Sequence, residues 1–142
     1  MSALTIEEIK VGKSYSEDIL FDENKLEGFI HLTKDTAGIH TKDSFSRRKG
    51  FDHRVIHGFL LSVYFSRIMG MELPGENTVI ASINLEFHEP VYINDMIKYS
   101  VKVERVLKSL GSVLLDLQIQ KSDGTICVKG KSTCFFKQDK EL

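Results

Sequence analysis

The feature that most constrains the fold is an apolar run at residues 57–70, which reads His-Gly-Phe-Leu-Leu-Ser-Val-Tyr-Phe-Ser-Arg-Ile-Met-Gly. Ser62 and Ser66 are the small polar exceptions in this run. A helix that is apolar on most of its faces has to be buried. Gly70 can close this helix and Pro74 prevents its continuation. We therefore predict a buried central helix that other elements surround.

The sequence pattern changes to a period of two after this helix. Apolar residues at 79, 81, 83, 85 and 87 alternate with the residues between them, which predicts a strand with one buried face. Three further strands are predicted at 96–107, 112–121 and 125–137, separated by turn-forming residues around Gly111 and Gly124. Successive strands with short turns form an antiparallel meander, and a curved sheet of this kind can wrap an apolar helix. The predicted fold is therefore α+β, of the hotdog type.

The segment upstream of the central helix is the first place to look for a site. Residues 22–34 have a helical period, with Asp22 as the N-cap. Residues 35–56 show no clear period and are predicted to be mostly loop. A loop of this length is unusual in a compact domain unless it is functional or contains short helical turns.

Length and charge narrow the class of protein further. A chain of 142 residues favours one domain, which we place at 1–142. The net charge of -1 gives no basic field for nucleic acid or an anionic membrane. Neither a signal-peptide pattern at the start nor an apolar run of about eighteen residues is present in the sequence. These features predict a cytoplasmic protein with no nucleic-acid or membrane partner.

Two short segments carry residues suited to acid–base chemistry. Asp35 and His40 lie five residues apart around Gly38, and a carboxylate and an imidazole that hold one water could share a proton transfer at neutral pH. His57-Gly58 begins the central helix, whose free N–H groups attract negative charge. This helix end could therefore stabilise the negative charge that develops on a carbonyl oxygen.

These segments resemble motifs of the MaoC-like family of (R)-specific enoyl-CoA hydratases. The family motif Asp-x-Asn-Pro-x-His matches Asp35 and His40 in identity and spacing, although Ala37-Gly38 replaces Asn-Pro. Residues 51–60, Phe-Asp-His-Arg-Val-Ile-His-Gly-Phe-Leu, are similar to the family segment Phe-Gly-x-Arg-Ile-Val-His-Gly-Met-Leu. Residues 87–95 are similar to its Phe-x-x-Pro-Val-x-x-Gly-Asp pattern. The likeness spans roughly residues 10–137.

The resemblance implies a hydro-lyase that adds water to a trans-2-enoyl thioester or removes it from a 3-hydroxyacyl thioester. Asp35 and His40 would hold the water and move protons. The N–H of Gly58 would polarise the thioester carbonyl, and His57 beside it would contribute to the oxyanion and substrate-binding site. Ser66, nine residues after His57, would complete the site. No separate cofactor is implied, because coenzyme A or the phosphopantetheine of an acyl carrier protein is part of the substrate. The family also implies a homodimer with its sites at the subunit interface.

Further basic and imidazole groups in the sequence have the character of ligand contacts. Arg47, Arg48 and Lys49 are candidate contacts for the phosphates of coenzyme A or for an acidic carrier protein, although a solvated loop explains them as well. His53 and His57 have the i, i+4 spacing of a zinc pair on a helix. Their surroundings favour strand and no third ligand is evident, so no metal site is expected.

Two alternatives to a hydratase stay open at this stage. A hotdog thioesterase is suggested by an Asp followed by Gly and His, but Ile39 separates Gly38 from His40. A non-catalytic hotdog subunit that only binds acyl thioesters is allowed by the loss of Asn-Pro, because proline stiffens a loop and asparagine can anchor it.

Overall fold

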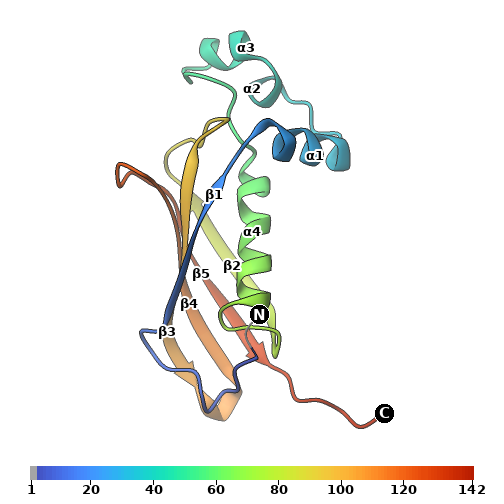
Figure 1. Cartoon of the computed structure of the whole chain (residues 1–142), viewed down its shortest axis with the longest axis vertical. Helices are drawn as coiled ribbons and strands as arrows, with labels where there is room; N and C mark the ends of the chain where they lie inside the picture. The colour runs from blue at the N-terminus through green and yellow to red at the C-terminus, as the bar shows by residue number, and fades with distance from the viewer. Residues whose placement is uncertain (1–2) are drawn as a thin grey trace.

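The central helix lies along one face of a five-stranded sheet in the computed structural model, which describes residues 3–142. The apolar run 57–70 forms this helix, α4 (Gly58–Met71), which begins one residue after His57 and ends one residue beyond Gly70. Its buried side chains are Leu60, Leu61, Phe65, Ile68 and Met69. Figure 1 shows the sheet on one side of α4 and three shorter helices above its N-terminal end.

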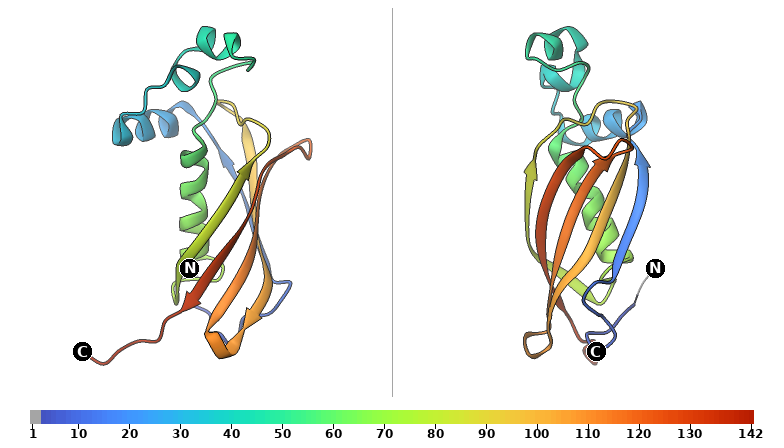
Figure 2. Two further views of the ribbon diagram at one scale, coloured as in Figure 1. Left: turned by 180° about the vertical axis from the view of Figure 1, so that it is seen from behind. Right: turned by 90° about the vertical axis from the view of Figure 1, so that its left-hand side faces the viewer.

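The sheet is antiparallel throughout and has the order β1-β3-β4-β5-β2. Its strands are β1 (Ser14–Leu20), β2 (Thr78–Phe87), β3 (Met96–Leu107), β4 (Ser112–Lys121) and β5 (Ile126–Phe136), and a 3-10 turn (Lys108–Leu110) joins β3 to β4. The right-hand view of Figure 2 shows all five strands side by side in front of α4. This arrangement confirms the predicted α+β hotdog fold.

Two details of the predicted sheet differ from the structure. β1 was not predicted, and it pairs with β3 at one edge of the sheet. β3, β4 and β5 form the predicted meander, but β2 pairs with β5 instead of its neighbour in sequence, β3. The chain therefore crosses the end of the sheet between β2 and β3, and β2 becomes the opposite edge strand.

The apolar pattern of β2 was wrongly assigned to one buried face. A bulge between Ile80 and Ser82 shifts the pairing with β5, so that Ile80 and Ile83, with Leu85 and Phe87, pair with the core-facing residues of β5. Side chains of paired residues point to the same side of a sheet. Nevertheless Ile83 and Phe87 remain 43% and 53% exposed, because no element within residues 3–142 covers them.

The central helix is likewise buried on one side only, which corrects the prediction of a helix surrounded on all sides. Phe59 is 81% exposed and Val63 is 52% exposed. The sheet covers the opposite side, where the hydroxyl of Tyr99 on β3 donates a hydrogen bond of 2.6 Å to the carbonyl of Leu61. This bond anchors α4 to the buried face of the sheet.

The segment before α4 forms a cap over the end of the sheet. α1 (Glu23–Thr33) has Asp22 as its N-cap, as predicted, with the carboxylate accepting from the N–H of Lys25 at 3.1 Å. The predicted loop 35–56 contains two short helices, α2 (Gly38–Thr41) and α3 (Asp43–Arg48). No helix in residues 3–142 is long and apolar enough to cross a membrane.

Candidate active site

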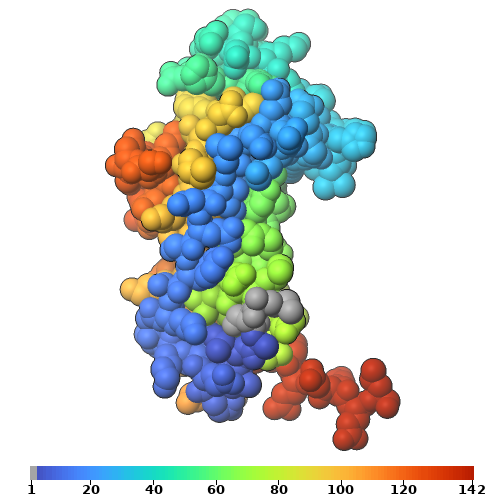
Figure 3. All heavy atoms as spheres, viewed as in Figure 1, coloured from blue at the N-terminus to red at the C-terminus, as the bar shows by residue number. Residues whose placement is uncertain are grey.

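A cavity of about 990 Å³ lies between α1, α4 and β2, on the side of α4 that the sheet leaves uncovered. In Figure 3 α1 overhangs this side of the helix. Most of the lining is apolar, and the polar groups gather at the end where α4 begins. The lining residues are Gly28, Phe29, Leu32, Thr33, Asp35, His40, His57, Gly58, Phe59, Leu60, Ser62, Val63, Ile83, Leu85 and Phe87.

Asp35, His40 and His57 meet at the polar end of this cavity. One side-chain donor atom from each of them lies within 4.8 Å of the other two. Two hydrogen bonds of about 2.8 Å span more than this separation, so a single water can bridge Asp35 and His40. The structure therefore brings the predicted pair together, and adds His57 to it.

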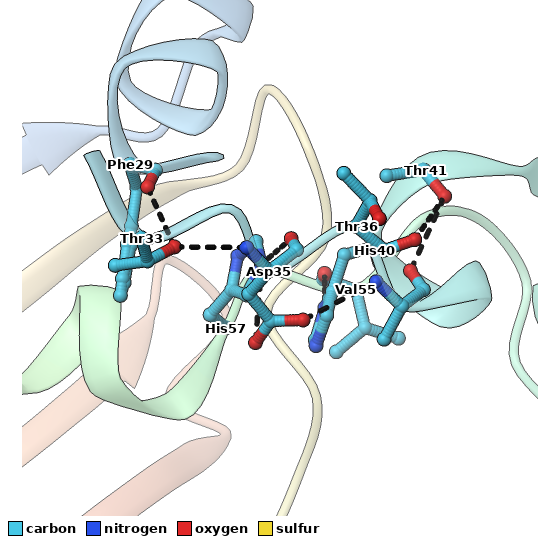
Figure 4. Close-up of polar contacts among 9 residues, drawn as sticks. Phe29, Thr33, Asp35, Thr36, His40, Thr41, Val55 and His57 are labelled. Carbon is cyan, nitrogen blue, oxygen red and sulfur yellow. Dashed lines mark hydrogen bonds and ion pairs between the residues drawn. The ribbon is translucent and has the colours of Figure 1, made fainter. Parts of the chain in front are cut away.

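Asp35 is held by the backbone on either side of it. Its N–H donates to the hydroxyl of Thr33 at 3.2 Å, and that hydroxyl donates to the carbonyl of Phe29 at 2.8 Å. The carboxylate accepts the N–H of Ala37 at 3.2 Å through Oδ1. Figure 4 shows these bonds linking the end of α1 to the start of α2. The side chain of Asp35 is half exposed, so its carboxylate is accessible from the cavity.

His40 is fixed in one tautomer by its contact with the segment before α4. Its Nδ1 lies 2.6 Å from the carbonyl of Val55, and the N–H of Val55 donates to the carbonyl of Ile39 at 2.8 Å. A carbonyl can only accept a hydrogen bond, so Nδ1 carries the proton in the neutral ring. The lone pair is then on Nε2, which is the nitrogen able to accept a proton from a water.

His57 contacts both Asp35 and His40. Its Nε2 is 3.1 Å from the backbone carbonyl of Asp35 and 3.8 Å from the carboxylate Oδ2. Its ring stacks on that of His40 with centroids 3.7 Å apart and planes inclined by 22°. Its ring also meets Phe29 edge to face at 4.8 Å. Burial lowers the pKa of His57, so the ring is neutral at neutral pH.

The stacking of the two imidazoles does not suit joint binding of one metal ion by His40 and His57. A metal ion lies close to the plane of each imidazole that binds it, and nearly parallel planes do not converge on one ion. Each ring also directs one nitrogen to a backbone carbonyl.

Gly58, at the start of α4, faces the cavity beside Phe87. A Cβ at this position would lie 3.0 Å from the Phe87 ring, so glycine permits the close contact between α4 and β2. Among residues 3–142, no hydrogen bond occupies the N–H groups of Gly58 and Phe59. The first N–H groups of a helix have no partner within it. This helix end therefore offers donors to a carbonyl oxygen in the cavity.

The other sequence candidates lie outside the cavity in this chain. Ser66 is exposed and does not line it, whereas Ser62 does, with its hydroxyl donating to the carbonyl of Gly58 at 2.7 Å. The basic residues of α3 and its C-cap are all exposed, and none of them lines the cavity. Arg47 donates to the carbonyl of Asp52 at 3.2 Å. Arg48 and Lys49 lie over the ring of Phe45, each 5.5 Å from its centroid.

Several lining residues were missed by sequence reasoning. Phe29, Leu32 and Thr33 come from α1, and Ile83 and Phe87 come from β2. Leu32 is 82% exposed although it is large and apolar. An apolar residue on the outer face of an amphipathic helix was the available signal, but the sequence alone does not show that this face borders a cavity.

Comparison with known proteins places these features in one family. The sequence model of the MaoC like domain matches residues 5–115. The (R)-specific enoyl-CoA hydratase of Aeromonas caviae is 24% identical over 129 residues, which cover 91% of this chain and 96% of that protein.

A second relative and a solved structure extend the comparison. The mitochondrial 3-hydroxyacyl-[acyl-carrier-protein] dehydratase of Arabidopsis thaliana is 34% identical over 89 residues, 63% of this chain and 52% of that protein. The unliganded R-hydratase PhaJ1 of Pseudomonas aeruginosa superposes with a TM-score of 0.86 at 23% identity, covering 97% of this chain and 90% of that one. With the family model matching most of its length, the chain belongs to the MaoC-like domain family.

Proposed function

We propose that this protein is a hydro-lyase that catalyses the reversible hydration of a trans-2-enoyl thioester to a 3-hydroxyacyl thioester. The observation that carries the proposal is the meeting of Asp35 and His40 at the polar end of a mostly apolar cavity, beside the N-terminus of α4. Relatives named as enoyl-CoA hydratase, 3-hydroxyacyl-carrier-protein dehydratase and 3-hydroxybutyryl-CoA dehydratase support it.

In the proposed reaction Asp35 and His40 hold one water against the β-carbon of the enoyl group. The water oxygen bonds to the β-carbon as one of the pair removes a water proton, and a proton is delivered to the α-carbon. The lone pair on Nε2 of His40 suits it to accept a proton. The N–H of Gly58 would donate to the thioester oxygen, on which negative charge develops as the water adds.

The substrate's own carrier would supply the rest of the binding. The acyl chain would lie along the apolar lining, and coenzyme A or phosphopantetheine would extend out of the cavity. The exposed Arg48 and Lys49 remain candidates for contact with the carrier phosphates. If they make this contact, an Arg48→Ser change should raise KM for a crotonyl-CoA substrate and leave KM for a crotonyl thioester of N-acetylcysteamine unchanged.

We further propose that the protein is a cytoplasmic homodimer or a multiple of it. β2 is an edge strand, and an edge strand presents unpaired N–H and C=O groups. Next to this edge lie the exposed apolar side chains of Phe59, Val63, Ile83 and Phe87. A second copy paired along β2 would cover both features. Light scattering should show twice the chain mass or more, and a uniform monomer at micromolar concentration would contradict the dimer.

One assay separates the proposed reaction from its alternatives. A crotonyl thioester is incubated with the protein while enoyl absorbance and free thiol are followed in parallel. A hydratase lowers the enoyl absorbance and releases no thiol. Release of thiol would identify a thioesterase. Binding of the thioester with neither change would identify a non-catalytic subunit.

A further inference from the structure

The buried ring of His57 contacts both members of the proposed acid–base pair. We infer that His57 is a positioning residue, a neutral imidazole that fixes Asp35 and His40 relative to each other, and this inference rests on the proposed function. Its two contacts use different parts of the ring. One edge donates to the Asp35 backbone at 3.1 Å, and one face stacks on His40 at 3.7 Å.

The placement of His57 suits it to this task. It directly precedes α4, so its backbone is tied to the longest helix of the molecule. Asp35 and His40 come from the segment between α1 and α3, in which the only helix carrying either of them, α2, has four residues. A single turn of this length is not stable by itself. A ring that touches both groups therefore links a short, locally unstable segment to a rigid element.

The protonation state of His57 follows from its partners. Nε2 faces a carbonyl, so it carries the proton, and Nδ1 is left with a lone pair. Nδ1 is buried and has no hydrogen-bond partner among the described residues. The titratable groups that face the ring are Asp35 and His40, and Phe29 packs on it as an apolar neighbour. Burial lowers the pKa of His57, and this keeps a second positive charge away from His40 when that ring accepts a proton.

This role differs from the substrate contact expected from the sequence. His57 is only 3% exposed. One of its nitrogens is directed to the Asp35 backbone and the other is buried, so neither is presented to a substrate in the cavity. Its influence on the reaction has to pass through Asp35 and His40. A change at His57 should therefore alter kcat more than KM.

Two substitutions test the inference. His57→Gln keeps an N–H donor that can reach the Asp35 carbonyl, whereas His57→Leu is apolar and has none. Misplacement of reacting groups by about 1 Å can cost about 100-fold in rate. We expect His57→Leu to lower kcat for a crotonyl thioester by about 10-fold to 100-fold with KM nearly unchanged, and His57→Gln to recover most of that loss. His31→Gln and His31→Leu, at an exposed position of α1, are the matched controls.

Nitrogen NMR of the histidine side chains tests the same geometry without catalysis. The wild-type spectrum should show His57 neutral with its proton on Nε2, and His40 with its proton on Nδ1 when neutral. A charged His57 at neutral pH, or a proton on its Nδ1, would overturn the inference. So would unchanged kcat in His57→Leu, a rise in KM alone, or equal loss in both variants in proportion to lost stability. If the wild type hydrates no enoyl thioester, the proposed function fails, and the kinetic role of His57 fails with it. The spectra then still decide whether the ring holds Asp35 and His40 as described.

Discussion

Replacing Gly130 by alanine should loosen the edge strand that forms one wall of the cavity. Gly130 lies in the middle of β5 and pairs with Leu85 on β2. A Cβ at this position would collide with the carbonyl oxygen of Asn84 and would lie 2.6 Å from a methyl carbon of Leu85. The leucine side chain can rotate away, but the backbone carbonyl can move only if β2 moves with it.

The clash with β2 and the removal of a glycine change the free energy of unfolding in opposite directions. Adding atoms to a packed site costs roughly 1–3 kcal/mol, and a clash with backbone belongs at the upper end of that range. Removing a glycine from a strand returns roughly 0.5–1 kcal/mol. We therefore expect a net loss of about 2 kcal/mol in the free energy of unfolding. For a chain of this size, that lowers Tm by about 4–8 °C.

Thermal unfolding and steady-state hydration together test this prediction. Gly70→Ala is the matched control, because its Cβ would meet no atom within 4 Å and it lies in α4. That change should raise the stability by roughly 0.5–1 kcal/mol. Gly130→Ala should also raise KM, because Leu85 lines the cavity. A Gly130→Ala protein with the Tm and KM of the wild type would refute the reasoning.

Three further changes test other parts of the structure. Tyr99→Phe removes the hydrogen bond to the carbonyl of Leu61 and should cost about 1–2 kcal/mol in a denaturant titration, so an unchanged midpoint would argue against this anchor of α4. Because the pKa of His57 is lowered from 6.5, the unfolded chain binds a proton that the folded chain does not, so stability falls as pH decreases below 6.5. His57→Gln should reduce the slope of the unfolding free energy against pH by up to about 1.4 kcal/mol per pH unit. The same slope in the variant and the wild type would contradict a buried neutral ring. Gly58→Ala should change the free energy of unfolding by no more than about 1 kcal/mol, because the exposed Phe87 ring can turn aside. It should lower kcat/KM about 10-fold or more, because the added methyl crowds the N-terminus of α4. Unchanged kinetics would show that no substrate atom approaches this position.

Local signals in the sequence predicted most of the elements of this fold. The N-cap Asp22 and the helical period located α1, and the apolar run at residues 57–70 located α4. The strands β3 and β4 were predicted at their observed bounds, because turn residues mark their ends clearly. The short α2 and α3 could not be predicted from periodicity, since helices of four and six residues are too short to show it.

Burial was harder to predict than secondary structure. The apolar residues of β2 and of the outer side of α4 predicted that these surfaces would be covered, but not by what. In this chain Phe59 and Ile83 are exposed. The bulge near Ile80 also changes which residues share a face, and the alternating pattern carried no signal for it.

The sequence predicted which residues form the candidate site more fully than it predicted how they contact one another. Spacing and family resemblance selected Asp35 and His40, and the structure brings them together. The position of His57 against His40 and Asp35 depends on contacts across 17 and 22 residues of chain, which no local pattern encodes. Ser62 lines the cavity and Ser66 does not, a difference of one helical turn that only the packing of α4 decides.

The most direct test of the account is the hydration of a crotonyl thioester by the Asp35→Asn variant beside the wild type. Asparagine nearly keeps the shape of the side chain, and its carbonyl oxygen can still accept the N–H of Ala37, so Tm should be unchanged. General acid–base groups contribute about 10²–10⁴-fold in rate, so we predict a fall of at least roughly 100-fold in kcat. His40→Ala should fall by a similar factor, because the two groups act on one water. An Asp35→Asn protein that is folded and as active as the wild type would contradict the account.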